Sequence, residues 1–426
     1  MNISVVGSGY AALTLSACLA EMGNQVSVFF DNGQISPEIP VYEPGLSAMI
    51  AANVSGRRLC FSESIEEAVS DADFVFLSHP HEPGNTQRVI EDLQRFASSL
   101  PAECIVVNST ATELGATNTL RGVLAEIAAV DVHIAVHPLF LKEGDAIDDL
   151  MHPDRIIAGV ESHGVRTRIA ELFKPFMRQQ DRIHFMTPIE AELSRFAANG
   201  MLATRVSFMN EIAAIAEQCG ADIEQVRQGI GADPRIGYAY LYPGVGYGGH
   251  HLPEDIQSLI AASGDQAPLL TAVATRNDLQ HSWAFAQLND ALGALTGKRV
   301  AIWGLAFRPG TDDVNGSPAI VLIRQLLDAG AHVAAYDPMA IESAAEEFGA
   351  SASLTFASHQ YDALADADAL VLMTEWKPFR LPDFNAVKRL LRTPLIVDGR
   401  NQYDGDALHQ SGFDYRGVGR GHIKKL

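Results

Sequence analysis

The stretch that decides the fold is Asn2–Ala12, NISVVGSGYAA, followed by QVSVFF at residues 25–30 and then by Asp31. An apolar, β-branched run enters a glycine turn, a helical pattern follows, and a second apolar run ends on an acid. This order is typical of the first unit of a doubly wound parallel sheet. Gly7 and Gly9 let a pyrophosphate approach the helix start, and Asp31 can hydrogen-bond ribose hydroxyls. The motif favours NAD over NADP; FAD, or a tight turn that binds nothing, are the alternatives.

The same pattern returns in the last third of the chain, so we expect two wound halves. Between them, residues 188–230 have helical periodicity with almost no breaker, which predicts a long helix that packs on another helix and forms a dimer surface. The expected fold is α/β, with two Rossmann-like doubly wound parallel-sheet domains joined by a long central helix in a helical dimerisation domain. The expected domains are 1–187, 188–296 and 297–426. The strands expected beyond the first two are at 73–78, 103–109, 132–138, 298–304, 332–337, 366–372 and 394–399.

Composition excludes several classes of protein. A chain of 426 residues with 47% apolar residues predicts two or three well-packed domains, and the net charge of −21 argues against a nucleic-acid partner. It has no run of eighteen apolar residues and no signal-peptide pattern at the start, so we expect no membrane span and a cytoplasmic location. The four cysteines form no CxxC and are expected to be ordinary buried thiols.

From end to end, the chain resembles the UDP-glucose/GDP-mannose dehydrogenase family. The matching segments are GSGYAA (7–12), VYEPGL (41–46), FLKEGDAIDDLMHPDR (140–155), FAANGMLATRVSFMNEIA (196–213), DPRIG (233–237), PGVGYGG (243–249), GLAFRPGTDD (304–313), AYDP (335–338), TEWKPF (374–379) and IVDGRN (396–401). The resemblance implies a nucleotide-sugar partner and a homodimer formed through the central helix. It also implies NAD as cofactor, reduced twice as the sixth carbon of the sugar goes from alcohol through aldehyde to acid.

Site residues follow from the resemblance position by position. The implied catalytic set is His251, Asp255, Asn199, Arg195, Glu143 and Thr110. The implied cofactor contacts are Gly7, Gly9, Tyr10, Ala11, Asp31, Thr110 and Glu143. The implied substrate contacts are Phe140, Leu141, Arg235, Tyr240, Gly244, Gly248, Arg308 and Arg400. Alternatively, the residues of the substrate set serve only packing: the glycines form a tight turn, and Arg400 forms an ion pair.

Several positions depart from the family pattern. His251 stands where the family has the cysteine that forms a thioester, so the usual second oxidation is in doubt. Arg195 replaces a lysine; it keeps the charge but cannot exchange a proton near neutral pH. Ser36, Glu254 and Asn315 replace basic residues that contact NAD phosphates, which predicts weaker NAD binding.

The loop YPGVGYGGHHLPED at 242–255 suggests two readings of its histidines. His251 and Asp255 can act as a general base and its orienting partner, or His251 can be merely structural. We expect no metal site from His250, His251, Glu254 and Asp255, because the leucine–proline step should interrupt the helix. Three functions remain: an NAD-dependent oxidoreductase without a thioester step, a non-oxidative enzyme on a nucleotide sugar, or a binding protein without turnover.

Overall fold

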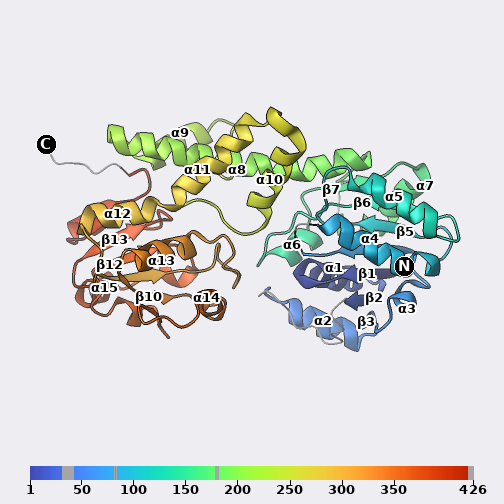
Figure 1. The fold of residues 1–426 in the computed structure, drawn as a ribbon, viewed down its shortest axis with the longest axis horizontal. Coiled ribbons are helices and arrows are strands. Elements are labelled where there is room, and N and C mark those ends of the chain that lie inside the picture. Colours follow the sequence, from blue (N-terminus) through green and yellow to red (C-terminus); the bar gives the residue numbers. More distant parts are fainter. Residues whose placement is uncertain (31–42, 81, 83, 178–181, 421–426) are drawn as a thin grey trace. The chain divides into compact units, whose positions relative to one another are not determined.

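The computed structural model describes residues 1–30, 43–80, 82, 84–177 and 182–420, and it divides into two compact units, Met1–Ala197 and Ala198–Leu426 (Figure 1). Asp31 and Ser36 lie outside the described residues, so the predictions about the ribose acid and the missing basic residue stay predictions. Within the described residues, no helix is long and apolar enough to cross a membrane.

The first unit is built on an eight-stranded sheet in the order β3-β2-β1-β4-β5-β6-β7-β8. Every neighbouring pair is parallel except β6 and β7, which pair antiparallel. The strands are β1 Asn2–Gly7, β2 Gln25–Phe30, β3 Leu59–Phe61, β4 Phe74–Ser78, β5 Ile105–Asn108, β6 His133–Val136, β7 Ile156–Gly159 and β8 Ile183–Met186.

Helices cover both faces of this sheet, which explains why its strands are continuous apolar runs. Successive residues point to opposite faces, so Val5 packs in one core cluster with α1 and α7, and Val6 in another with α4 and α5. The helices are α1 Gly9–Glu21, α2 Leu46–Ser55, α3 Ile65–Val69, α4 Asn85–Phe96, α5 Ala116–Ile127, α6 Ala146–Met151 and α7 His163–Phe173.

The second unit has a six-stranded, fully parallel sheet in the order β11-β10-β9-β12-β13-β14. Its single large core includes Trp303, which is fully buried. The strands are β9 Arg299–Trp303, β10 His332–Tyr336, β11 Leu354–Phe356, β12 Ala369–Leu372, β13 Leu395–Asp398 and β14 Asp414–Gly417. The helices are α13 Pro318–Asp328, α14 Ile341–Phe348, α15 Phe384–Leu390 and α16 Gly405–Gln410. The predicted α/β architecture with two wound sheets is therefore confirmed.

The central helices differ from the prediction in one respect. The periodic segment 188–230 is not one helix: α8 is Pro188–Cys219, and α9 is Ile223–Gly231. Gly220 takes a left-handed conformation (φ 75°) that ends α8, and Asp222 caps α9 by accepting from the Glu224 N–H. Apolar periodicity runs through both helices, so it hid the break.

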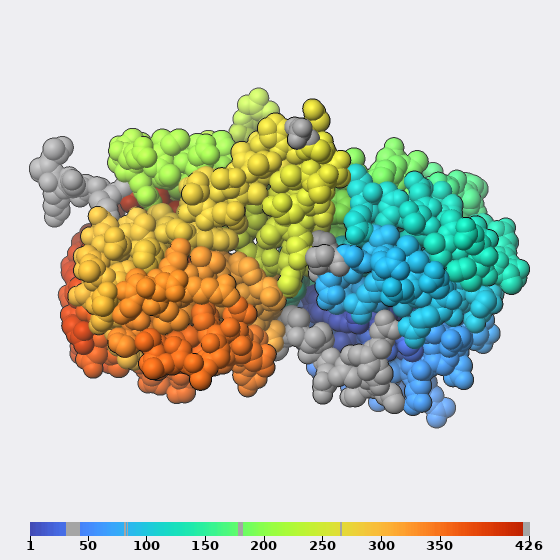
Figure 2. All heavy atoms as spheres, in the orientation of Figure 1, coloured from blue at the N-terminus to red at the C-terminus, as the bar shows by residue number. Residues whose placement is uncertain are grey.

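Three more helices complete the middle of the chain, α10 His251–Ser263, α11 Pro268–His281 and α12 Trp283–Leu292. Within the second unit, α8 packs on α11 through the Ser207 hydroxyl, which donates to the Val273 carbonyl at 3.1 Å. Figure 2 shows the yellow atoms of α10 and α11 beside yellow-green atoms of the preceding helices on the surface of this unit.

Candidate nucleotide and active site

In the first sheet the strand order reverses between β1 and β4, and ligands of open α/β sheets bind at such a point, outside the carboxyl ends of the strands. Gly7 ends β1, and a β-carbon there would lie 1.8 Å from the Ser78 carbonyl oxygen of β4. The Ser8 N–H donates to that same oxygen at 3.1 Å. Helix α1 starts at Gly9, so its unpaired N–H groups lie at the crevice, where a phosphate group binds well.

Buried polar atoms at this edge support a polar ligand. Ser78 Oγ, His79 Nδ1 and Ser109 Oγ are buried and have no hydrogen-bond partner among the described residues. Such atoms are uncommon in native proteins and fit a site that a hydrogen-bonding ligand completes. Thr110 follows directly, and its hydroxyl accepts from the His79 N–H at 3.2 Å. The edge therefore fits a dinucleotide.

Arg88 is a residue at this edge that sequence reasoning missed. It lies in the first turns of α4, and its Nη2 donates to Ser8 Oγ in the glycine turn at 3.1 Å. Glu82 lies 3.6 Å from the same guanidinium on the exposed side. The sequence shows only an arginine after an irregular segment, with no motif to place it beside the turn.

Glu43 connects the cofactor turn to the segment of Glu143. It is 6% exposed and accepts from the Tyr10 hydroxyl at 2.8 Å, from Gly144 N–H at 2.7 Å and from Ile147 N–H at 3.2 Å. Burial, aided by the negative charge of Glu43, raises the pKa of Tyr10. The structure thus brings Tyr10 next to the segment that carries Glu143.

The neighbouring residues Phe140 and Leu141 are half-buried. The Arg155 guanidinium lies over the Phe140 ring at 4.1 Å from its centre, an attractive contact that fixes the ring.

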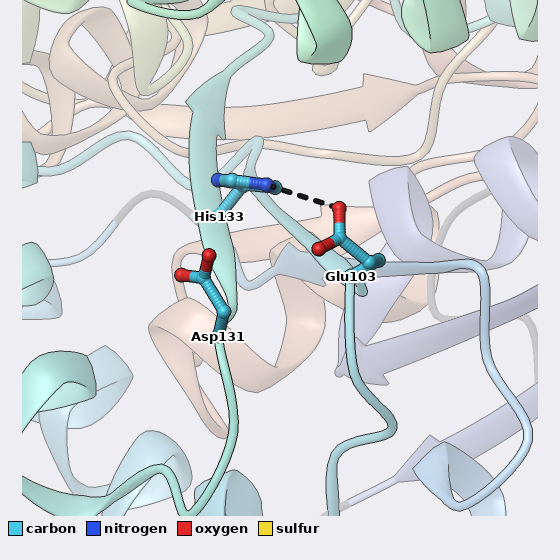
Figure 3. Close-up of side chains that lie close together, drawn as sticks. All are labelled: Glu103, Asp131 and His133. Atoms are coloured by element: carbon cyan, nitrogen blue, oxygen red, sulfur yellow. Dashed lines mark ion pairs between the residues drawn. The ribbon is translucent and has the colours of Figure 1, made fainter.

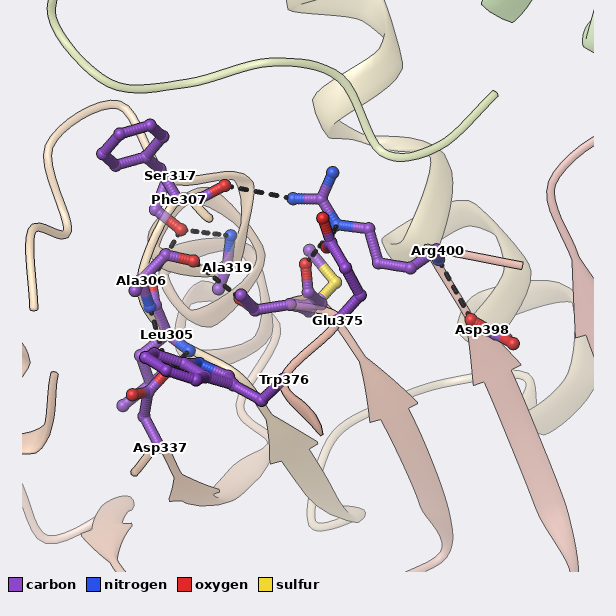
Figure 4. Close-up of polar contacts among 12 residues, drawn as sticks. Leu305, Ala306, Phe307, Ser317, Ala319, Asp337, Glu375, Trp376, Asp398 and Arg400 are labelled. Carbon is purple, nitrogen blue, oxygen red and sulfur yellow. Dashed lines mark hydrogen bonds and ion pairs between the residues drawn. The ribbon is translucent and has the colours of Figure 1, made fainter. Parts of the chain in front are cut away.

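In the second sheet the order reverses between β9 and β12, and Arg400 lies at this point. Its Nε donates to the Met373 carbonyl at 2.6 Å and its Nη2 to the Phe307 carbonyl at 3.3 Å, which joins the segments after β12 and β9 (Figure 4). Glu375 lies 3.2 Å from the guanidinium. Arg308 follows Phe307, so both predicted arginines lie at the carboxyl edge of this sheet.

Carboxylates hold the loops of this edge in place. Asp398 accepts from the Arg400 N–H at 3.0 Å, and Asp337 accepts from the indole N–H of Trp376 at 2.9 Å and from two backbone N–H groups after β9 (Figure 4). Burial raises the pKa of Asp398, although three hydrogen bonds to its charged form oppose the shift.

The glycine loop 243–249 packs against the same edge. Gly244 donates its N–H to Asn210 Oδ1 at 2.8 Å, and a β-carbon on it would lie 3.0 Å from the Gly399 carbonyl. A β-carbon on Gly248 would lie 2.2 Å from the Gly316 carbonyl. Of the predicted substrate-binding set, Gly244 therefore lies beside Arg400, and Gly248 lies beside Gly316 in the same unit.

Two other predicted substrate contacts lie on an exposed loop after α9. Arg235 has 87% of its side chain exposed and forms an ion pair with Asp233 at 2.6 Å. Tyr240 has a left-handed backbone (φ 59°), with its ring 6.4 Å from that of Tyr242. Within its own unit, Arg235 does not join the buried set around Arg400.

The predicted active residues of the second unit meet at the start of α10. His251 is its first residue, and Asp255, fully buried one turn later, accepts from Asn199 Nδ2 at 2.5 Å. The prediction that the leucine–proline step interrupts this helix was wrong. Pro253 lies in the first turn of α10, where the missing N–H of proline costs no intrahelical hydrogen bond. Arg195 belongs to the first unit; it is buried on α8 four residues before Asn199, so both side chains lie on one face of that helix.

His250 has acidic neighbours of its own. Its Nδ1 lies 3.3 Å from Glu254 and its Nε2 4.0 Å from Asp313. Asn315 also binds Asp313, through its side-chain amide at 2.6 Å. These carboxylates and the imidazole make a polar rim beside the glycine loop.

Two doubly wound sheets, each with polar groups gathered at its switch point, define a two-site nucleotide-binding α/β protein. The chain belongs to the UDP-glucose/GDP-mannose dehydrogenase family. The NAD-binding domain of that family matches residues 1–177, the central domain matches 189–279, and the UDP-binding domain matches 301–405.

Relatives of this family match along their whole length. The chain is 40% identical to a UDP-glucose 6-dehydrogenase of Pseudomonas aeruginosa, covering 100% of this chain and 99% of that one. It is 36% identical to a UDP-glucose 6-dehydrogenase of Rhizobium meliloti, covering 99% and 100%. The structure of a UDP-glucose dehydrogenase from Pyrobaculum islandicum is similar with a TM-score of 0.88 at 31% identity, covering 98% and 97%.

Proposed function

We propose that the protein oxidises a CH–OH group of a UDP-sugar, with UDP-glucose as the first candidate, and transfers the hydride to NAD. The observation that carries the proposal is the 2.5 Å hydrogen bond from Asn199 to the buried Asp255, one helical turn after His251 and next to the glycine loop. Relatives named UDP-glucose 6-dehydrogenase support the choice of sugar nucleotide.

For the cofactor, the pyrophosphate would be held by the glycine turn and the start of α1, namely Gly7, Gly9, Tyr10 and Ala11. The nicotinamide half would contact Thr110 and Glu143, and the ribose would contact Asp31. NAD supplies the hydride acceptor when it is bound. We add Arg88 to this set, because its guanidinium lies at the glycine turn and can meet a phosphate charge. Arg88 would partly offset the weaker NAD binding that we predict from Ser36, Glu254 and Asn315.

For the chemistry, His251 with Asp255 would take the proton of the alcohol as the hydride leaves. Asn199 fixes one carboxylate oxygen of Asp255, and Arg195 would stabilise the developing oxyanion without exchanging a proton. With His251 in the position where the family has a cysteine, the acid would form through a hydrate without a thioester, or the reaction would stop at the aldehyde.

For the sugar nucleotide, Arg400, Arg308, Gly244 and Gly248 would form the binding edge of the second sheet. Phe140, Leu141 and Tyr240 would contact the sugar nucleotide, and the exposed Arg235 would reach the site of a second subunit. The proposed division of labour is 1–187 for NAD, 188–296 for dimerisation and 297–426 for the nucleotide sugar.

We propose a homodimer through α8. Met201, Phe208 and Ile215 are 61%, 53% and 52% exposed and follow one another at seven-residue intervals, so they form one apolar stripe. A groove of about 700 Å³ lined by residues of α8, α10 and α11 lies in the same unit. Phe208→Glu should halve the mass measured by light scattering, whereas the exposed Gln218→Glu on α8 should leave it unchanged; a monomeric wild type contradicts the proposal.

The function is tested by incubating UDP-glucose and NAD with the wild-type protein, Asp255→Asn and, as a control, the exposed Asp406→Asn. We expect NADH in the wild type and the control, and a loss of about a hundredfold or more in Asp255→Asn. Product without NADH would favour a non-oxidative enzyme, and tight binding of UDP-glucose without product would leave a binding protein. In His251→Cys, an acid product with two NADH per sugar would identify the lost nucleophile as the main departure.

A further inference from the structure

A histidine and two carboxylates converge at the end of the first sheet that is opposite to the glycine turn. Glu103 precedes β5, and Asp131 and His133 lie at the start of β6, so all three are at the amino ends of these strands. One ligand atom of each lies within 4.8 Å of the others, and His133 Nε2 is 3.6 Å from Glu103 Oε2 (Figure 3).

The backbone holds these three residues in register. The Glu103 N–H donates to the Asp131 carbonyl at 2.9 Å, and the His133 N–H donates to the Cys104 carbonyl at 3.0 Å. Arg168 donates to the Glu103 carbonyl, not to its carboxylate. The backbone positions of the three residues are therefore fixed relative to one another, and their side chains are partly exposed.

The charges of the cluster are poorly balanced. Over the described part of the chain, His133 is the only ion-pair partner of Glu103, and Asp131 has none. Two carboxylates this close repel each other unless a cation lies between them. Asp131 and His133 also line a cavity of about 360 Å³ with Arg121 and Glu161, which leaves room beside them.

We propose that Glu103, Asp131 and His133 form a binding site for a divalent transition metal ion, with zinc as the best fit. One imidazole nitrogen and two carboxylate oxygens are a ligand set that zinc accepts, at about 2.0–2.2 Å each. The ligand atoms now lie within 4.8 Å of one another, so the three side chains have to rotate toward a common point to coordinate the ion. The fourth position would hold water on the side of the cavity.

The place of the site predicts what the metal does. Because the cluster lies at the amino ends of β5 and β6, it is at the edge of the sheet opposite to Gly7 and Thr110. The ion would cross-link the segments before β5 and β6 and stabilise the folded first unit, without taking part in oxidation. The proposal is thus independent of the proposed function, and either one can fail alone.

The experiment is a titration of chelator-treated, tag-free protein with zinc chloride, followed by calorimetry and by thermal unfolding. The expectation that all four cysteines are buried was wrong for Cys60 and Cys219, which are exposed. All chains therefore carry Cys60→Ser and Cys219→Ser, because exposed thiols are zinc ligands in their own right. The variants are Glu103→Gln, Asp131→Asn and His133→Ala. The matched control is His152→Ala, which removes an exposed histidine whose Nδ1 lies 2.8 Å from Asp148. Among the described residues, this pair is not part of a group of three possible metal ligands.

We expect one saturable zinc per chain and a melting temperature that rises with zinc. Each of the three ligand variants should weaken binding about tenfold or more, whereas His152→Ala should not change it. The near-isosteric variants Glu103→Gln and Asp131→Asn should melt like the parent without metal, which excludes misfolding as the cause. Equal zinc binding in all chains, an equal loss in the control, or no saturable binding at millimolar zinc overturns the proposal.

Discussion

Glu43 is a single buried carboxylate that holds three donors from two distant segments, Tyr10 in α1 and the N–H groups of Gly144 and Ile147. Glu43→Ala leaves these donors without an acceptor, so we expect the first unit to lose about 3 kcal/mol of stability. The KM for NAD should rise as well, because Tyr10 and the Glu143 segment lose their common anchor. Urea unfolding and steady-state kinetics measure the two effects.

The exposed Glu126→Ala on α5 is the control for Glu43→Ala and should change neither quantity. Unchanged stability of Glu43→Ala would mean that its three hydrogen bonds contribute nothing net.

Arg88 gives a second prediction at the level of one side chain. If its guanidinium meets a cofactor phosphate beside Ser8, Arg88→Ala should raise the KM for NAD by roughly 10–100-fold. The KM for UDP-glucose should stay the same. Arg121→Ala, which removes a surface pair with Glu161 at 2.9 Å, is the matched control. An unchanged KM for NAD would remove Arg88 from the site.

Sequence reasoning proposes residues whose chemistry is visible in a motif, and it misses residues whose contacts depend on the fold. The close approach of the loop glycines to other backbone could be anticipated. The placement of His251 and Asp255 on one continuous helix was not anticipated, because the leucine–proline step was expected to interrupt it. The contacts of Glu43 and Arg88 could not be anticipated, because their partners are far away along the chain; Glu43 lies in the matching segment VYEPGL, but the segment does not show what the carboxylate binds.

The glycine loop 243–249 is an element whose path depends on close backbone approach. Gly248→Ala would place a β-carbon 2.2 Å from the Gly316 carbonyl, so the loop has to move away from the edge of the second sheet. We expect the KM for UDP-glucose to rise roughly tenfold, with the KM for NAD unchanged. Steady-state kinetics with each substrate varied in turn provide the measurement.

Gly122→Ala is the control for the loop, because a β-carbon there has no atom within 4 Å and alanine favours a helix. Wild-type kinetics in Gly248→Ala would show that the loop tolerates the displacement.

At the level of elements, prediction succeeded for strands buried on both faces. β1, β4, β5, β9 and β12 are continuous apolar runs and were anticipated. The short β3 and β11, each three residues long, and β7, β8 and β14 were not. β3, β8, β11 and β14 each bury at most two residues, so their apolar signal does not stand out from the helices and loops around them. β7 buries all four of its residues, as β5 does, so its burial does not explain why it was missed.

For the whole molecule, His137 predicts how stability depends on pH. It is buried after β6 with Nδ1 2.9 Å from the Ile157 carbonyl, and burial lowers its pKa from 6.5 to about 4. The unfolded chain therefore takes up a proton near pH 6.5, and the folded chain only near pH 4. Stability from the neutral imidazole is complete above pH 6.5 and is lost as the pH falls toward 4, by about 3 kcal/mol.

His137→Asn, which keeps an N–H donor but does not titrate, should flatten the stability profile between pH 6.5 and 4. The comparison uses urea unfolding of both chains at several pH values. The same slope in both would mean that other groups cause the acid sensitivity.

The architecture of the whole chain was predictable because its two halves repeat one pattern. Both sheets place their first strand beside the fourth in the same order, β3-β2-β1-β4-β5 and β11-β10-β9-β12-β13. The boundary between the two compact units could not be predicted in the same way. The division into two units falls at residues 197 and 198, inside the continuous helix α8, and nothing in the sequence of a helix marks such a point.

The contact between Gly7 and the Ser78 carbonyl has a consequence for genetics. Every amino acid other than glycine has a β-carbon, and at this position it would lie 1.8 Å from a backbone oxygen. Any missense allele at codon 7 is therefore expected to be a null allele, whichever base changes. In a complementation assay such an allele gives the loss-of-function baseline, and the phenotype of a chain altered at His251 can be ranked against it.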